Sequence, residues 1–429
     1  MNYKKMKGLL LILLMTMAGL AGCLGTDDDE KDEEEEVVST MDASDAGYTY
    51  ASNVDNHRSL MKDLCDIKSA ASSDGGYNFA EAKNIYMNGK NAQKDSGSYR
   101  TLAGFAAADG KNHGYDAFYN QSGSVDAHIM AALDGTGDFA GTSDTVRYQG
   151  IAKLTANLGM VAYTIHELNS AVGKAAVGNI DNDSGAPHNW DEGWAFFHGP
   201  DEDWSCSPAY TMKKRAADFG TETGGVSNAL SATEAAMVAG LAALQANDST
   251  AYNSAVDTIM KNVIITYSQA TLKYTSKMDS NTSGPKYQAE GYTFWKTIEA
   301  YVADYTDACY NNKTHGMAWI GAGQASNCDA FQWYENTTMP GGASFTGCYN
   351  MEVHVVASDV NETECNEGFG SVGSTGMPMY YDNYGANQMN EILDLTDSSK
   401  LGTAYDVSAW FTGAWAHYGI TSADIGTLA

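Results

Sequence analysis

The sequence predicts a mainly α-helical protein with a duplicated helix pair forming one or more bundles, followed by an irregular segment tied by disulfides. Three observations support this prediction. Two stretches carry apolar residues at alternating steps of three and four, a shared motif follows each stretch, and four cysteines lie close together further along the chain. Steps of three and four place apolar side chains on one stripe of a helix, and bundles bury such stripes.

Each apolar stretch is long enough to form one helix of a bundle. The first follows Thr142-Ser143-Asp144, and the second lies between Ala251 and Tyr274. Both stretches keep this spacing over several turns. Each therefore predicts one helix with an apolar stripe, which we call a seam helix. The apolar series are Ile151, Leu154, Leu158, Val161, Ile165, Leu168 and Val172 in the first stretch, and Val256, Met260, Val263, Tyr267, Ala270 and Tyr274 in the second.

A motif rich in glycine, carboxylate and aromatic residues follows each seam helix. It reads SGAPHNWDEGWAFFHG at residues 184–199 and SGPKYQAEGYTFW at residues 283–295. One inserted residue in the first copy aligns Glu192-Gly193 with Glu290-Gly291. Each copy opens with serine, glycine and proline, residues that break regular structure, and this predicts a turn leading into a helix. The repeated order of helix, loop and motif predicts an internal duplication, once across residues 145–200 and again across 251–306.

The first 23 residues have the order of an export signal. Lys4, Lys5 and Lys7 precede an apolar run at residues 8–19, and small residues then lead to Cys23. This order resembles the lipobox of bacterial and archaeal lipoproteins, in which Cys23 would carry the lipid. An ordinary signal peptide or a single anchor helix is the alternative, although the run is shorter than the roughly 20 residues that span a bilayer. Each interpretation places the rest of the chain outside the membrane.

The remaining chain is expected to contain four parts. Residues 24–42 form an acidic tether, because TDDDEKDEEEE at 26–36 is self-repelling and has no apolar anchor. A first helical half at 43–205 and a second, degenerate half at 206–306 follow. Residues 307–429 are expected to form a Cys-rich irregular segment with C-terminal helices, in which only Met351 to Val356 alternates clearly enough for a strand.

Composition excludes several classes of function. The formal net charge is −29 at pH 7, so the surface repels nucleic acid and no nucleic-acid partner is expected. No nucleophile elbow, P-loop, HExxH or dinucleotide motif occurs, and we therefore do not expect an enzyme. Six cysteines besides Cys23 make an even set without zinc-type spacing, which in an exported chain indicates disulfides.

The two halves differ most where one of them carries imidazole and carboxylate groups. Aligning the seam helices places His166-Glu167 of the first half on a serine and a glutamine of the second. In the motifs, His188 and Asp191 become lysine and alanine, whereas Glu192 is kept as Glu290. Residues needed only for folding should occur in both halves, so those present in one half are the better candidates for a site.

Mixed histidine and carboxylate ligands suit iron and other borderline metal ions. Tyr163, one turn before His166, could add a phenolate ligand. Structural alternatives exist for these residues: a hydrogen-bonded His-Glu pair at a bundle flank, and a helix N-terminus stabilised by Asp191 or Glu192. The predicted metal ligands, in the first half, are Tyr163, His166, Glu167, His188, Asp191 and Glu192.

Five phrases are similar to a known family: IYMNGKN at 85–91, ALDGTGDF at 132–139, IHEL at 165–168, SGAPHNWDEGWAFF at 184–197 and WFTGAWAHYGI at 410–420. They resemble the iron-assimilating, or low-iron-inducible periplasmic, proteins of algae and prokaryotes. The resemblance implies an exported protein that assists iron acquisition by binding iron. The pairing of a His-Glu helix with a Glu-Gly segment is also similar, at the level of fold, to the helical imelysin-type iron-uptake proteins.

We therefore expect a cell-surface protein, lipid-anchored to the outer face of the cytoplasmic membrane, that binds Fe²⁺ or Fe³⁺ for a separate iron transporter. The alternative hypothesis is a surface adhesion or ligand-capture module without a metal, in which the aromatic-rich motif binds an organic molecule or a protein. A structure distinguishes the two hypotheses by whether the six predicted ligands lie close enough to share one ion.

Overall fold

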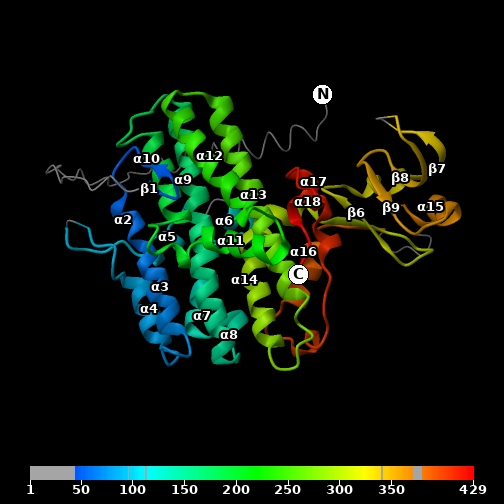
Figure 1. Ribbon diagram of the computed structural model, residues 1–429. Coiled ribbons are helices and arrows are strands. Elements are labelled where there is room, and N and C mark those ends of the chain that lie inside the picture. Colours follow the sequence, from blue (N-terminus) through cyan, green and yellow to red (C-terminus); the bar gives the residue numbers. More distant parts are fainter. Residues whose placement is uncertain (1–43, 95, 112–113, 340–341, 371–378) are drawn as a thin grey trace.

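The computed structural model describes residues 44–94, 96–111, 114–339, 342–370 and 379–429. Its architecture is mainly helical, as predicted, with a smaller β-rich lobe beside the helices (Figure 1). Cys23 and the acidic tether lie outside the described residues. Among those described, no helix is both long and apolar enough to cross a bilayer.

The N-terminal part begins with a two-stranded hairpin and continues through helices to the first motif. Its last helix, α10, contains the motif, and α9 packs against it. The elements are β1 (Ser44–Asp45), β2 (Tyr48–Thr49), α2 (Asp55–Arg58), α3 (Leu60–Ala71), α4 (Phe79–Asn88), α5 (Leu102–Ala106), α6 (Gly114–Tyr119), α7 (Ser124–Asp134), η1 (Gly137–Phe139), α8 (Asp144–Lys153), η2 (Leu154–Gly159), α9 (Met160–Ala176) and α10 (Ala186–Phe197).

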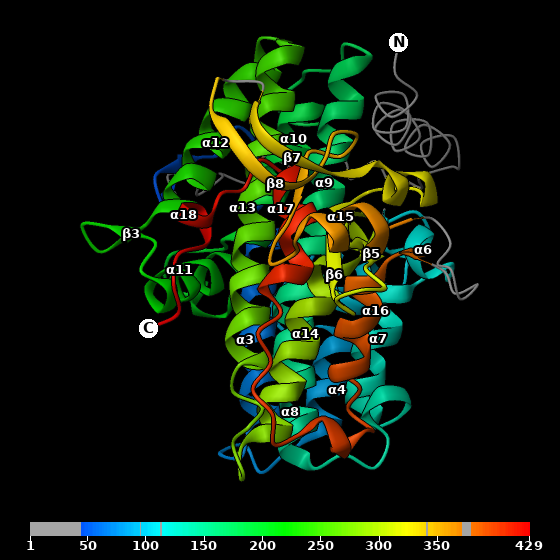
Figure 2. The ribbon, with the colours of Figure 1, turned by 90° about the vertical axis from the view of Figure 1, so that its right-hand side faces the viewer.

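The central part contains the second helix pair. Helix α13 packs against α14, which contains the second motif, and α12 packs against both α10 and α13 (Figure 2). The elements are η3 (Trp204–Cys206), α11 (Pro208–Phe219), β3 (Glu222–Thr223), β4 (Val226–Ser227), α12 (Asn228–Gln245), α13 (Ser249–Thr275), α14 (Gly284–Val302) and η4 (Ala303–Tyr305).

The C-terminal part forms the β-rich lobe and then returns to the helices. Helix α16 packs against α14, and α18 packs against α13. The elements are β5 (Asp307–Tyr310), β6 (Met317–Gly321), η5 (Ala325–Ala330), β7 (Phe331–Thr338), β8 (Ser344–Asn350), β9 (Val355–Ala357), α15 (Glu362–Gly368), β10 (Tyr380–Tyr381), α16 (Tyr384–Ile392), η6 (Ser398–Lys400), η7 (Ser408–Phe411), α17 (Thr412–His417) and α18 (Ser422–Ile425).

The first seam helix runs without a gap from Asp144 to Ala176, as predicted, but it contains a π-helical segment. A π-helical turn, η2, separates α8 from α9. Within it, Thr155 Oγ1 donates to the Ile151 carbonyl at 2.7 Å, and Asn157 Nδ2 donates to the Lys153 carbonyl at 2.9 Å. These side chains satisfy carbonyl groups beside the wider turn. The predicted seam residues from Ile151 to Leu168 are nevertheless all buried.

The glycine that follows the shared glutamate lies at a close contact in both halves. A Cβ atom on Gly193 would lie 3.2 Å from Leu168 Cδ2, on the neighbouring helix α9. A Cβ atom on Gly291 would lie 2.9 Å from Leu393 Cδ2. Tight packing around the motif helix therefore explains why both copies keep this glycine.

The predicted irregular segment contains two antiparallel three-stranded sheets, in the orders β10-β5-β6 and β7-β8-β9. Met351 to His354, which we expected in a strand, forms a turn between β8 and β9. Asn350 Oδ1 accepts hydrogen bonds from the backbone N–H groups of Glu352 and Val353 at 3.0 and 3.3 Å, which turns the chain. Alternation over six residues was too short to distinguish a strand from this turn.

Three disulfides connect the cysteines of the described residues, as the even count predicted. Two are local and lie in the β-rich lobe, Cys309–Cys328 and Cys348–Cys365. The third, Cys65–Cys206, joins α3 to η3 across 141 positions of sequence. It therefore connects the N-terminal helices to the segment that follows α10.

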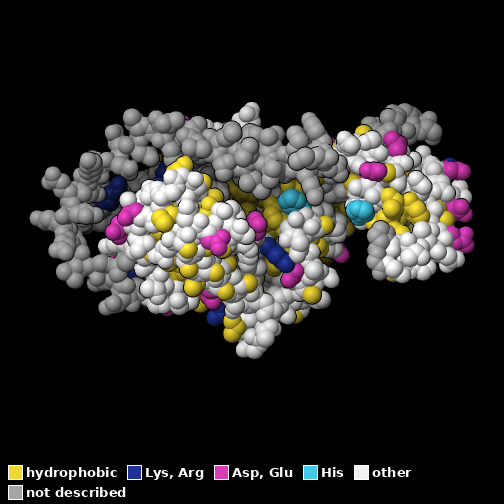
Figure 3. Space-filling model, turned by 90° about the horizontal axis from the view of Figure 1, so that it is seen from above, with side chains coloured by type: hydrophobic (Ala, Val, Ile, Leu, Met, Phe, Trp, Pro, Cys, Tyr) yellow, Lys and Arg dark blue, Asp and Glu magenta, His cyan; other side chains and the backbone are white. Residues whose placement is uncertain are grey.

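A cleft of about 710 Å³ lies where the β-rich lobe meets the helices. Strand β6, residues 352–360 and helix α17 line it, and His354 and His417 are part of that lining. Seen from above, the lobe projects from the helical part, and histidine side chains lie near the junction (Figure 3). None of the predicted metal ligands lines this cleft.

Candidate metal-binding site

Glu192 lies at the centre of the candidate site. It is in the middle of α10, whose N-cap is Gly185, so it does not cap the helix. Its Oε1 lies 3.0 Å from Nε2 of His57 and 3.1 Å from Nε2 of His188. Glu192 is 9% exposed and His57 is 5% exposed. A buried carboxylate is thus held between two imidazole rings.

A second buried carboxylate, Glu167 on α9, belongs to the same cluster. Asn189 Nδ2 donates to Glu167 Oε2 at 2.6 Å and lies 3.4 Å from Glu192 Oε2, so it connects the two carboxylates. His166 Nε2 lies 3.8 Å from Glu167 Oε1 on the other side. Helices α9 and α10 therefore bring together both predicted His-carboxylate pairs.

The pKa values of the two carboxyl groups are shifted in opposite directions. Burial, and then repulsion from Glu192, raises the pKa of Glu167 well above its usual range. Burial also acts to raise the pKa of Glu192, but His57 and His188 outweigh it and hold that pKa well below its usual range. The site therefore favours the ionised form of Glu192 and the protonated form of Glu167.

Ser52 determines which nitrogen of His188 carries a proton. Its Oγ donates to Asp191 Oδ2 at 2.8 Å and lies 2.8 Å from His188 Nδ1. Because the single hydroxyl proton goes to Asp191, Nδ1 of His188 must be the donor to Ser52. The 3.1 Å contact between His188 Nε2 and Glu192 then requires a further proton or another cation between the two atoms. A metal ion can meet the same requirement.

Asp191 faces away from Glu192, although the two are neighbours in sequence. Its carboxylate accepts hydrogen bonds from Tyr48 OH at 2.7 Å and from the backbone N–H groups of Ala51 and Ser52 at 2.9 and 2.8 Å. Adjacent residues of a helix point about 100° apart, which accounts for the divergence. In this structure Asp191 holds the segment before α2, which positions His57, and orients His188 through Ser52.

We expect Asp191→Ala to destabilise the chain by about 3 kcal/mol, because it leaves the N–H groups of Ala51 and Ser52 and the buried Tyr48 hydroxyl without an acceptor. Urea denaturation monitored by circular dichroism measures the change. Asp191→Asn keeps one oxygen acceptor and is expected to lose less. A loss smaller than about 1 kcal/mol for the alanine variant would show that Asp191 does not hold this segment.

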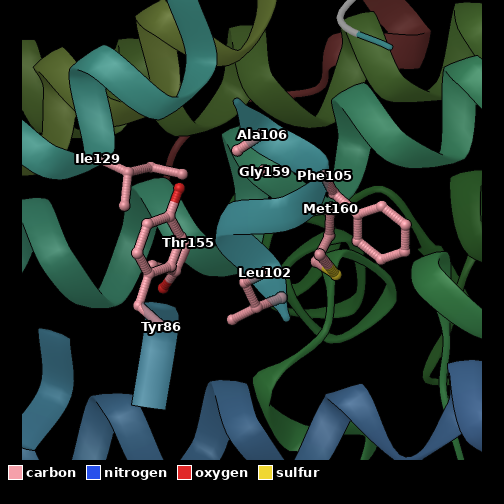
Figure 4. A pocket seen from close by; sticks show the side chains of 8 residues that line it. All are labelled: Tyr86, Leu102, Phe105, Ala106, Ile129, Thr155, Gly159 and Met160. Atoms are coloured by element: carbon pink, nitrogen blue, oxygen red, sulfur yellow. The ribbon is translucent and has the colours of Figure 1, made fainter. Parts of the chain in front are cut away.

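Tyr163 lies beside the cluster, and its hydroxyl is buried without a hydrogen-bond partner among the described residues. Its ring packs against Phe196, with ring centroids 4.4 Å apart, and contacts Phe105. Phe105 also lines a cavity of about 10 Å³, closed by side chains of α4, α5, α7, η2 and α9 (Figure 4). That volume holds at most one water molecule, so the cavity is not a ligand site.

Sequence reasoning missed His57 and Asn189. His57 comes from the four-residue helix α2, far upstream of the motif, and no periodic pattern marks it. Burial lowers the pKa of His57, against the attraction of Glu192, and its Nδ1 is buried with no described partner. Asn189 lies inside the motif and aligns with Tyr287 of the second half, but it is neither an imidazole nor a carboxylate, so the comparison of the two halves did not single it out. Only the packing of α2 on α10 reveals the complete cluster.

The cluster is closed by its own hydrogen bonds in this structure. Among the residues that the structure describes, no group of three or more His, Cys, Asp or Glu side chains is arranged to hold a metal ion. An incoming ion would have to replace protons that now lie between imidazole and carboxylate groups. Donor types that suit iron are thus present, in a protonated and hydrogen-bonded arrangement.

The profile of the Low iron-inducible periplasmic protein family, Fea1, matches residues 36–303. The match covers more than half of the chain and includes α2, α9 and α10. The chain belongs to this family. No curated protein and no solved structure matches it. Membership in the Fea1 family confirms the resemblance and connects the chain with iron assimilation under low iron.

Proposed function

We propose that this Fea1-family chain binds iron outside the cytoplasmic membrane and holds it for a separate transporter. Glu192, His57, His188 and Glu167 form the binding group, with His166 and Tyr163 beside them. Iron is the cargo, as Fe²⁺ or Fe³⁺, and the chain acts by binding rather than by catalysis. A lipid on Cys23 attaches it to the outer face of the membrane.

One observation supports this proposal above the others: two buried carboxylates and three imidazoles lie in one connected cluster. Two carboxylates in a low-dielectric interior repel each other unless protons or a cation compensate their charge. Histidine and carboxylate donors together suit iron, and a phenol such as Tyr163 adds a donor that ferric iron prefers. Asp191 then supports His188 without touching the ion.

Iron retention after desalting tests the proposal. Protein loaded with Fe²⁺ under anaerobic conditions, or with Fe³⁺ in air, is expected to keep about one iron per chain. A control variant replaces the acidic residues of 26–36 by Asn and Gln, and we expect it to keep the same amount. Loss of all retained iron in that control would assign binding to the tether and contradict the proposal. Absence of binding to the wild type would favour the capture module instead.

Iron affinity is expected to rise with pH, because binding displaces protons from the cluster. Burial and the neighbouring Glu192 raise the pKa of Glu167 well above its usual range, which favours the protonated form. The proton competes with iron at every pH below the Glu167 pKa, so affinity falls as pH decreases. Calorimetry in buffers of different ionisation enthalpy measures the protons released, expected to be about two per iron.

The matched control for this prediction is Glu167→Gln, which keeps the size and the hydrogen bond to Asn189 but has no proton to lose. We expect it to release about one proton fewer per iron. Equal proton release by the wild type and by this variant would exclude Glu167 from the binding group.

A further inference from the structure

A second group of metal-binding side chains lies between α7, η1 and α14, outside the candidate iron site. Tyr292 on α14 is at its centre. Its hydroxyl donates to Asp138 Oδ2 at 2.6 Å and lies 3.2 Å from Nδ1 of His128. A phenol, an imidazole and a carboxylate from three separate elements therefore meet at one oxygen atom.

The spacing of these three atoms is that of ligands around a single ion. Nitrogen and oxygen donors bind borderline metal ions at about 2.0 to 2.2 Å, so two donors at right angles lie about 2.8 to 3.1 Å apart. The distances from the Tyr292 oxygen, 2.6 and 3.2 Å, are close to this range. Only a small movement of the three side chains is needed to place an ion between them.

Neighbouring aromatic rings hold the group in place. Phe139, which follows Asp138, is buried, and its ring packs against that of Tyr292 with centroids 5.6 Å apart. The ring of Tyr119 packs against that of His128 at 4.9 Å. Tyr292 is 4% exposed, whereas Asp138 is exposed. An ion can thus enter from solvent on the Asp138 side and meet donors that are already positioned.

The protons now held by the group can be replaced by an ion. The single phenol proton goes to Asp138, so Nδ1 of His128 donates to the Tyr292 oxygen. Burial, and then the charge of Lys296, lowers the pKa of His128 to about 4, so the imidazole is neutral at neutral pH. Lys296 Nζ lies 2.7 Å from Glu299 Oε2, which compensates its charge. A bound ion would release the phenol proton to solvent and move the imidazole proton to Nε2.

The donor set favours Cu²⁺. Among the divalent first-row ions, Cu²⁺ forms the most stable complexes with nitrogen and oxygen donors, and it prefers a tetragonal arrangement. One nitrogen and two oxygen donors, together with a water molecule, fill four positions in one plane. Zinc sites are instead built from Cys, His, Asp and Glu side chains.

We propose that His128, Asp138 and Tyr292 form a copper-binding site beside α14. The phenol is present in one motif only. Trp194 holds the position of Tyr292 in the first motif, and its indole donates to the Asp45 carbonyl. The site rests on its own residues and does not depend on iron binding at Glu192.

Titration of iron-free, full-length protein with Cu²⁺ tests the site, with glycine in excess to compete with weak surface sites. A phenolate bound to Cu²⁺ gives a charge-transfer band in the visible spectrum, and we expect this band to saturate at about one copper per chain. Tyr292→Phe keeps the ring but should abolish the band and weaken copper binding about tenfold or more. Asp138→Asn should weaken binding to a similar extent.

Tyr301→Phe is the matched control, because it removes another phenol of α14 whose hydroxyl is buried without a described hydrogen-bond partner. We expect it to keep the band and the affinity of the wild type. No band in the wild type, or a band that persists in Tyr292→Phe, would overturn the proposal. If circular dichroism shows that Tyr292→Phe is unfolded, Asp138→Asn decides, and unchanged copper affinity in that variant would overturn the proposal.

Iron retention separates this site from the proposed function. We expect Tyr292→Phe to retain iron as the wild type does. Loss of iron from this variant would assign the phenol to iron and contradict the copper assignment.

Discussion

Glu192→Gln is expected to weaken iron binding by about a hundredfold or more, the largest effect of any single substitution in the candidate site. Changes to residues that only support a metal ligand typically lower affinity about 10- to 100-fold, so loss of a central ligand should reach or exceed that range. Glu192 touches both His57 and His188, and the amide cannot supply the negative charge that the ion needs. Competition with a chelator of known affinity measures the change.

Glu290→Gln is the matched control, because Glu290 holds the equivalent place in the second half and is likewise buried. We expect its iron affinity to equal that of the wild type. A comparable loss in both variants would show that the effect comes from packing of the motif helices. Wild-type affinity in Glu192→Gln would exclude Glu192 as a ligand.

Removing the Cys65–Cys206 disulfide is expected to destabilise the chain by about 4 to 5 kcal/mol, since it closes the longest loop of the three. The disulfide joins α3, which follows the helix of His57, to η3, which follows the helix of Glu192. Chemical denaturation of Cys65→Ser/Cys206→Ser measures the loss. The local pair Cys309–Cys328 spans 19 positions, so its removal should cost less, about 3 kcal/mol. A smaller loss for the long-range pair than for the local pair would contradict this expectation.

Local patterns predicted the helices well because they depend on periodicity. The apolar series from Ile151 to Leu168 is buried as the steps of three and four require. The π-helical turn at 154–159 was not predictable in this way. Thr155 and Asn157 stabilise it through side-chain hydrogen bonds to backbone carbonyl groups, and these do not change the spacing of the apolar residues. The strands of the β-rich lobe are short. Each contains too few residues for the alternation of apolar and polar side chains to be recognised in the sequence.

The candidate site was predicted where comparison of the two halves could detect it. His166, Glu167, His188 and Glu192 differ between the halves or lie in the motif, and the structure places all four in one cluster. Asp191 met the same criterion but faces the N-terminal segment, because neighbouring helix positions point in different directions. His57 could not be found, since its role arises from tertiary packing of α2 on α10.

Diffraction from iron-loaded crystals at the iron absorption edge tests the central claim most directly. If iron binds at the candidate site, we expect one strong anomalous peak within bonding distance of Glu192 and of at least one of His57 and His188. The same crystals of Glu192→Gln should lack that peak. A peak only at other carboxylates, or none in loaded wild-type crystals, would contradict iron binding between α2, α9 and α10.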